Sequence, residues 1–372
     1  MKNSLKVYRA QLTVLGPVFI GNGAELSKKE YIFLNGRKTA GIIDMKKFYS
    51  LVSKKGLRRQ FEDFMLDSRS RLSLGNWIRE YEIRNQEVKS CLDYVIDSGD
   101  TVIQRGTPVH IMECIKDPYG MPYIPGSSIK GMLRTVLLNG GIASSPEEFL
   151  RARESVIRTV ENPPFKINRK QFLAAERNMV EETQFYTLTR NEKRRGDAVN
   201  DMLAGMIVSD SEPLEMKDMV LCQKIERHTD GTEKRMNLLR ECIRPGTKIH
   251  FDITMERNIC PVQKENILSS IERFNEVYYD CFLSKFRGMD RPLSGQVYLG
   301  GGAGFVSKTF IYPLLGERQG LKTTMGIFQA TKVPREHKHN RDLEYGVSPH
   351  IVKCTRYQGQ CLEMGKCRLE IS

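Results

Sequence analysis

Glycines and a lysine near residue 300 form the stretch whose residue types point most directly to phosphate chemistry. Residues 298–310 read YLGGGAGFVSKTF, so Gly302 is followed after four residues by Ser307, Lys308 and Thr309. One residue separates this pattern from the loop G-x-x-x-x-G-K-[ST], which binds nucleotide phosphates. That loop must join a strand to a helix, whereas the alternation over residues 305–312 predicts a strand after the glycines. We therefore do not predict an NTPase.

The same glycines suit another kind of polyanion. Glycine lacks a Cβ, so the N–H groups of a glycine loop can line an extended backbone closely. A tight turn between a helix and a strand is the alternative, although such a turn needs only one or two glycines. The residues that we expect to bind a polyanion here are Gly300, Gly301, Gly302, Gly304 and Lys308.

A second stretch, residues 123–141, reads YIPGSSIKGMLRTVLLNGG and predicts a helix with a polar flank. Its apolar side chains recur at i, i+3, i+4, i+7 and i+8, which gives the helix one complete apolar face. Lys130 and Arg134 point within ~40° of each other beside that face, because a helix turns by ~100° per residue. Gly131 lies next to them, although a glycine inside a helix costs ~1 kcal/mol relative to alanine. Close approach of a ligand backbone would explain that glycine.

The start of this helix adds to the candidate site. Pro125 and Gly126 interrupt the chain, and Ser127 or Ser128 is placed to cap the helix. Free N–H groups and the positive end of the helix dipole favour a phosphate at this position. The alternative is a core helix whose cations only face solvent. The candidate phosphate ligands on this stretch are Gly126, Ser127, Ser128, Lys130, Gly131 and Arg134.

Strands and helices that must position these two stretches follow one another in a recognisable order. The strands that we expect are 5–14, 107–115, 205–209, 247–255 and 305–312, and the helices are 46–90, 146–160, 168–182 and 264–286. Asn35-Gly36 predicts a hairpin turn, and the charged segment 184–200 predicts an exposed loop or arm. With insertions set aside, the order is strand, helix, strand, strand, helix, strand. This order predicts an α+β, ferredoxin-like fold of the kind found in RNA-recognition domains.

Composition agrees with a polyanionic partner. The 372 residues include 58 lysines and arginines against 45 acidic residues, a net charge of +13, which favours nucleic acid. We see no secretory signal and no run near ~18 apolar residues, so we expect a cytoplasmic protein with reduced thiols and no membrane contact. Cys354, Cys361 and Cys367, with His350 nearby, match no familiar zinc spacing. We expect a C-terminal hairpin with small buried cysteines, no metal and no cofactor.

The two stretches together carry a resemblance to a known family. YIPGSSIKGMLR and YLGGGAGFVSKT resemble the first helix and the glycine-rich loop of the RAMP superfamily of CRISPR proteins, and VLGPVFIGNG resembles the turn after its first strand. The ending GVSPHIVKCTRYQGQCLEMGKC resembles the family of fifth subunits of type III-A (Csm) effector complexes, which cap the guide-RNA 3′ end.

This resemblance implies a ferredoxin-like core that contacts the backbone of a CRISPR guide RNA and packs against other Csm backbone subunits. It also implies an arm within 184–200 that touches guide or target RNA, and it leaves room for a recruited trimming nuclease. We divide the chain accordingly into the first strand and hairpin (1–45), a helical insertion (46–105), a core strand and phosphate-binding helix (106–141), a helical insertion and arm (142–204), the remaining core with the glycine loop (205–315) and a C-terminal extension (316–372).

Catalysis is not part of this expectation. Subunits of the family that cut target RNA carry an aspartate after the first strand, where this chain has only Glu25 and Glu30. A metal-independent endoribonuclease that processes the guide is the alternative function, and it needs a general acid and base, usually histidine. None of the six histidines lies in the turn after the first strand. We therefore predict an RNA-binding subunit without catalytic residues.

Overall fold

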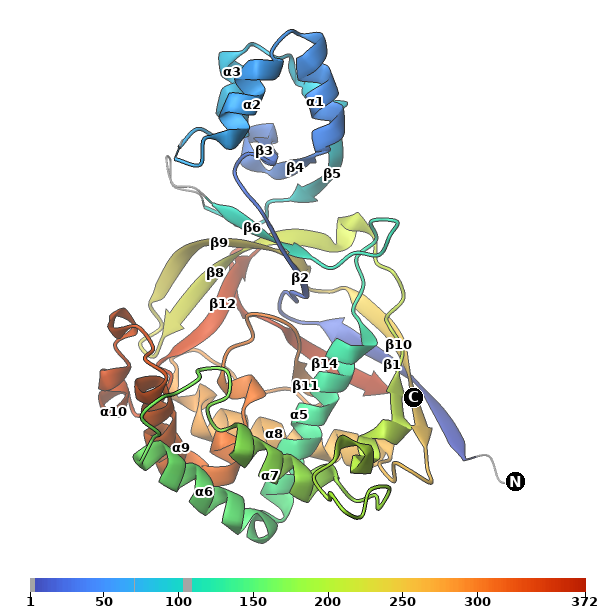
Figure 1. Cartoon of the computed structure of the whole chain (residues 1–372), viewed down its shortest axis with the longest axis vertical. Coiled ribbons are helices and arrows are strands. Elements are labelled where there is room, and N and C mark those ends of the chain that lie inside the picture. The colour runs from blue at the N-terminus through green and yellow to red at the C-terminus, as the bar shows by residue number, and fades with distance from the viewer. Residues whose placement is uncertain (1–3, 70, 103–108) are drawn as a thin grey trace.

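A computed structural model describes residues 4–69, 71–102 and 109–372 of the chain. A five-stranded sheet, in the order β11-β14-β1-β10-β7, lies in the main body, and a nine-stranded sheet lies above it in the view of Figure 1. Long helices form the bottom layer of that view, and a small helical lobe projects at the top. The chain is therefore an α+β protein, as predicted.

The five-stranded sheet is built around β1 (Leu5–Val14), which pairs antiparallel with β10 (Lys248–Glu256) and with β14 (Lys366–Ile371). Its edges are β7 (Met206–Val208) and β11 (Gln296–Tyr298). The predicted alternation along the first strand is confirmed, since Tyr8, Ala10, Leu12 and Val14 are all buried.

Helices lie on one side of this sheet. They are α5 (Gly126–Ser144), α6 (Leu150–Glu161), α7 (Ala174–Phe185), α8 (Lys264–Cys281) and α9 (Ile311–Ala330), with the short α10 (Asp342–Tyr345) beyond them. Helices α5 and α8 lie against the sheet, and the others pack beyond them. Helices α5 and α8 approach each other so closely that a Cβ on Gly140 would lie 2.5 Å from that of Ser270. The predicted apolar face of α5 is confirmed, because all five of its positions are buried: Ile129, Met132, Leu133, Val136 and Leu137.

The last strand of the expected ferredoxin-like order is in a different part of the chain. Residues 305–312 do not form the predicted strand, because Val306–Lys308 is a 3₁₀ turn and α9 begins at Ile311. Pro313 lies in the first turn of α9, where its missing N–H group is not needed. Strand β14, from the C-terminus, instead occupies the place beside β1. The C-terminal segment is thus part of the core sheet.

The second sheet runs in the order β2-β6-β9-β8-β5-β4-β3, with β12 paired to β8 and β13 paired to β12. Its strands are β2 (Gly21–Leu26), β3 (Tyr31–Leu34), β4 (Thr39–Ile43), β5 (Leu92–Asp97), β6 (His110–Cys114), β8 (Met219–His228), β9 (Glu233–Ile243), β12 (Ile351–Tyr357) and β13 (Gln360–Glu363). The predicted hairpin turn at Asn35-Gly36 and the predicted C-terminal hairpin are both confirmed. Of its cysteines, Cys354 is buried, Cys361 is only partly buried, and the buried Cys367 belongs to β14 of the other sheet. Residues 107 and 108 of the predicted strand 107–115 lie outside the described residues.

The predicted helical segment at 46–90 forms the projecting lobe. Its helices are α1 (Met45–Lys54), α2 (Arg58–Leu66), α3 (Leu74–Glu80) and α4 (Asn85–Lys89), inserted between the paired strands β4 and β5. Phe48, Phe61, Phe64 and Trp77 form a core that is separate from the main one. The Lys29 ammonium secures the lobe by donating to the carbonyls of Phe64 and Asp67 at 2.6 and 2.8 Å.

The segment 184–200 is largely exposed, which agrees with the predicted loop and not with a projecting arm. It is a strand-free surface loop that folds back on the buried Asn200, whose amide nitrogen donates to the carbonyls of Asn191, Arg194 and Arg195. Three hydrogen bonds from one side chain close the loop on itself. The part of the molecule that projects is the helical lobe (Figure 1). Within the described part of the chain, none of the helices has the length and apolar character needed to cross a bilayer.

Candidate nucleic-acid interface

A cleft of about 230 Å³ lies where the start of α5 meets the glycine loop that follows β11. Five of the predicted site residues line it: Ser127, Ser128, Gly131, Gly300 and Lys308. Thr135, Phe274, Tyr298 and Ser307 complete its polar and aromatic wall. The tertiary structure therefore brings the two stretches together, although 172 positions separate Ser128 from Gly300 in the sequence.

The N-terminus of α5 is capped differently from the prediction. Neither Ser127 nor Ser128 caps it; the N–H of Gly126 instead donates to the Asp210 carboxylate at 2.7 Å. A Cβ on Gly126 would lie 2.2 Å from the Val208 carbonyl oxygen, so the end of β7 requires glycine here. The carboxylate already occupies the electropositive helix end, which leaves the serine hydroxyls as the polar groups that face the cleft.

Lys130 and Arg134 are not the free cations that the helical pattern suggested. The Lys130 ammonium donates to the carbonyls of Leu203 and Met206, both at 2.7 Å, and burial lowers its pKa. The Arg134 guanidinium pairs with Asp201 at 2.6 Å and with Glu181 at 2.8 Å. Both cations therefore tie α5 to its neighbours within the chain and point away from the cleft.

Gly131 is the residue of α5 that no contact among the described residues explains. A Cβ at this position would meet no heavy atom within 4 Å, and the residue is exposed on the cleft wall. Its backbone is helical, so no special torsion angle requires glycine. Alanine would make a more stable helix. A ligand backbone bound closely against this surface would leave no room for a methyl group, and this would explain the glycine.

Most glycines of the loop, by contrast, have reasons within the chain. Gly300, Gly302 and Gly304 have φ values of 80°, 87° and 91°, which disfavour other residues. A Cβ on Gly300 would lie 2.3 Å from the Phe19 carbonyl oxygen, which accepts a hydrogen bond from the Gly301 N–H at 2.7 Å. The loop is thereby fastened to the turn after β1. Its glycines are explained by the fold before any ligand is considered.

The order strand, glycine loop, helix does occur here, from β11 to α9, which corrects one argument against an NTPase. Other features still exclude the phosphate loop of an NTPase. Ser307 replaces the second glycine of the motif, and β11 is an edge strand in an antiparallel sheet. The Lys308 ammonium donates to the Gly300 carbonyl at the other end of the loop. The loop therefore does not form the phosphate cradle of an NTPase.

Arg240 is a candidate that the sequence analysis missed. It lies in β9, its guanidinium is 5.5 Å from the centre of the Phe19 ring, and a Cβ on Gly302 would lie 3.4 Å from its Nη1. No carboxylate pairs with it within the described residues, and its Nε has no hydrogen-bond partner there. The apolar run 219–222 and the turn signal Asp230-Gly231 could have revealed the β8–β9 hairpin that carries it.

Comparison with known proteins agrees with this architecture. Residues 11–304 match the RAMP superfamily, which is most of the chain, so the chain belongs to that superfamily. It is similar to proteins described as CRISPR system Cms protein Csm5. The relative from Mycobacterium tuberculosis is 28% identical over 396 residues, covering 100% of this chain and 99% of the relative. The relative from Streptococcus thermophilus is 28% identical over 349 residues, with 90% of each chain covered.

Solved structures share the fold. The crystal structure of T. onnurineus Csm5 superposes with a TM-score of 0.60 at 17% identity, covering 96% of this chain and 99% of that one. A chain in the cryo-EM structure of a type III-A Csm–crRNA–target RNA ternary complex gives a TM-score of 0.58 at 18% identity, covering 98% and 100%. The predicted resemblance to the fifth Csm subunits is therefore confirmed.

Proposed function

We propose that this chain is a non-catalytic RNA-binding subunit of a type III-A Csm ribonucleoprotein, and that it holds the guide RNA toward its 3′ end. Similarity to Csm5 proteins over the whole chain supports the assignment to the complex. The net charge of +13 supports a nucleic-acid partner. Backbone contacts, which carry no sequence information, suit a subunit that must accept guides of any sequence.

Gly131 carries this proposal. Glycine at this position keeps the α5 side of the cleft open opposite the glycine loop. It lowers the stability of the helix, and no contact among the described residues offsets that loss. Serine and threonine hydroxyls and the exposed Lys308 surround it. Such a surface suits the phosphates and 2′-hydroxyls of a single RNA strand. From the predicted site we retain Ser127, Ser128, Gly131, Gly300 and Lys308 as RNA contacts. We add Arg240, the cation beside Gly302 of the glycine loop that has no carboxylate partner among the described residues.

An alanine substitution at Arg240 tests this interface. We expect Arg240→Ala to weaken binding of the purified chain about equally for two unrelated single-stranded RNAs, because phosphates have no base identity. The slope of log K against log salt should fall in magnitude by ~0.7, the value for one lost contact to a single strand. Arg318→Ala, an exposed change of equal charge on α9, is the matched control and should leave both quantities nearly unchanged. No binding by the unaltered chain, or equal losses in both variants, would contradict the proposal.

Assembly follows from the same assignment. We propose that the other Csm backbone subunits contact this chain, and that target RNA or a recruited trimming nuclease reaches the complex in the cytoplasm. The predicted segments 46–105 and 142–204, which lie outside the cleft-forming elements, are the proposed contact regions. Through them the subunit would contribute to guide maturation and antiviral defence. Pull-down of neighbouring subunits by a chain whose lobe residues 44–91 are replaced by a short turn, and by a chain carrying Arg153→Glu at an exposed position on α6, measures this directly.

A pair of exposed residues favours the alternative function, an endoribonuclease that trims the guide. His110 Nδ1 lies 3.6 Å from the Glu25 carboxylate, near the turn after β1, which is where acid–base chemistry would be placed. Our proposal expects His110→Ala to leave guide length unchanged in the assembled complex. A labelled guide that is shortened by the purified chain, and is no longer shortened after this substitution, would establish the nuclease instead.

A further inference from the structure

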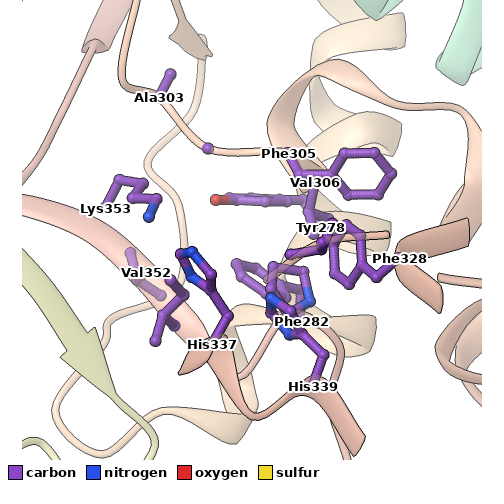
Figure 2. Close-up of a pocket in the computed structure, with 14 residues that line it drawn as sticks. Tyr278, Phe282, Ala303, Phe305, Val306, Phe328, His337, His339, Val352 and Lys353 are labelled. Atoms are coloured by element: carbon purple, nitrogen blue, oxygen red, sulfur yellow. The ribbon is translucent and has the colours of Figure 1, made fainter. Parts of the chain in front are cut away.

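Four of the six histidines gather on the far side of the glycine loop from the cleft. The His339 and His350 ring centres are 5.3 Å apart, His337 stacks on His339 at 5.9 Å, and His228 stacks on His350 at 5.8 Å. Of these four, His337 and His339 line a pocket of about 190 Å³ whose wall includes Gly304, Phe305 and Phe328. Figure 2 shows His337 and His339 on this wall, between Lys353 and Phe328.

Asp342 lies at the centre of this cluster. Its side chain is fully buried, and its two carboxylate oxygens face two different imidazoles, Oδ2 at 3.1 Å from His339 Nδ1 and Oδ1 in close contact with His350 Nδ1. One ligand atom from each residue lies within 4.8 Å of the other two. The side chains of His339 and His350 are only 13% and 7% exposed. Two nitrogens and a carboxylate thus converge in a mostly enclosed space.

The surrounding fold holds these groups in place. Asp342 begins α10, and its carbonyl accepts the Val347 N–H at 3.2 Å, which bends the chain back toward His350. The Phe328 ring packs against His339 at 4.4 Å, and the Tyr345 ring packs against His350 at 4.9 Å. Aromatic packing therefore fixes both imidazoles before any ligand arrives, which reduces the entropy that binding must overcome.

The charge of the site points to a cation. A fully buried carboxylate is costly unless it is paired, and within the described residues no lysine or arginine pairs with Asp342. The 3.1 Å between Oδ2 and His339 Nδ1 is close to the spacing of about 3.3 Å expected between two ligands that each lie about 2.05 Å from a tetrahedral zinc ion. The closer contact between Oδ1 and His350 Nδ1 would lengthen when an ion enters. Two imidazoles and one carboxylate favour zinc and similar transition metals over magnesium or calcium.

We propose that His339, Asp342 and His350 form a binding site for one divalent transition metal, with zinc as the reference ion. His337, whose ring centre lies 5.9 Å from that of His339 on the pocket wall, is near enough to hold a water molecule in the open coordination position. The metal would join the 339–342 turns to the segment that enters β12. The proposal does not depend on RNA binding, since none of these residues lines the α5 cleft.

Metal content and spectroscopy of the full chain test this site. The chain, purified without a polyhistidine tag, is loaded with Zn²⁺, dialysed and analysed for metal, and its melting temperature is measured before and after chelation. We expect one retained zinc per chain and a lower melting temperature after chelation. Asp342→Asn, His339→Ala and His350→Ala should each lose the zinc. His250→Ala, in β10 of the other sheet, and the double variant Cys354→Ser, Cys361→Ser should retain it.

Cobalt replacement of the metal in the unaltered chain keeps the test independent of how the variants fold. We expect the visible absorption of four-coordinate Co²⁺ with nitrogen and oxygen ligands, and no sulfur charge-transfer band. The proposal is overturned if the unaltered chain retains no zinc, if the three variants retain it as well as His250→Ala does, or if the cobalt spectrum shows thiolate ligands. The His339–Asp342–His350 contacts would then be a hydrogen-bonded structural cluster.

Discussion

Single residues differ in whether the chain itself explains them, and glycine shows this most clearly. Gly300 is required by its positive φ and by the Phe19 carbonyl, so its presence says little about a ligand. Gly131 has neither reason and lies exposed in the middle of a long helix. Gly131 lowers helix stability although no contact or torsion angle among the described residues requires glycine there. Such a residue indicates an external partner better than a conspicuous run of glycines does.

Gly131→Ala should therefore separate stability from function. We expect the free energy of unfolding to rise by about 1 kcal/mol, because alanine is the better helix residue and nothing lies within 4 Å of the added methyl group. RNA affinity should fall, and Gly131→Leu should abolish most binding by steric exclusion. Urea unfolding and RNA titration measure the two effects. Gly75→Ala, at an open position in the lobe helix α3, should not change the affinity. Unchanged RNA affinity in Gly131→Leu would remove α5 from the interface.

Among the elements, α5 depends on neighbours that are distant in sequence. Its two cations are paired with or bound by residues between 181 and 206, which belong to α7, to the segment before β7 and to the first residue of β7. The Arg134 guanidinium also lies 4.4 Å from the centre of the Phe185 ring. These contacts fasten the helix from its polar flank while its apolar face packs into the core.

Arg134→Ala should for this reason destabilise the fold. The side chains of Arg134, Glu181 and Asp201 are 25%, 24% and 17% exposed, so the substitution leaves two half-buried carboxylates without their cation. We expect a loss of about 2–3 kcal/mol in the free energy of unfolding, measured by urea denaturation. Arg151→Ala, an exposed position on α6, should change it by less than about 0.5 kcal/mol. Equal stability of both variants, with RNA binding lost only in Arg134→Ala, would return Arg134 to the RNA site.

At the scale of the whole molecule, the helical lobe and the core sheet differ in how they are connected. The lobe enters and leaves through neighbouring strands, since Ile43 pairs with Leu92 and the Asp44 N–H donates to the Cys91 carbonyl at 2.9 Å. Its core is separate from the main one. Strand β14, although last in the chain, lies between β1 and β11. The lobe is thus an appendage, and the C-terminus is central.

Removing each part should have opposite consequences. We expect a chain in which a short turn replaces residues 44–91, with Ile32→Thr on the uncovered face, to remain folded and to bind RNA through the cleft. Truncation after Met364, which removes a strand from the middle of the core sheet, should give an unfolded or aggregated product. Circular dichroism and size-exclusion chromatography distinguish the two. A truncated chain that folds normally would show that β14 is dispensable.

Local features of this protein could be determined from its sequence alone. The alternation of residues 5–14, the Asn35-Gly36 turn, the apolar face of α5 and the superfamily are all confirmed, because each is set by side chains a few residues apart. The glycine loop and the start of α5 were also identified as parts of one site. The structure brings both stretches to a single cleft, as this expectation requires.

Tertiary structure alone decided which groups at these stretches remain available to a ligand. Helical periodicity placed Lys130 and Arg134 on one flank, but their partners lie between 47 and 76 residues away in the sequence. The same holds for β14 beside β1, for Arg240 beside Phe19 and for the histidines around Asp342. Local patterns determine the direction of a side chain relative to its own backbone. Its partners depend on long-range packing, which brings together oppositely charged and polar groups whose burial would otherwise be costly.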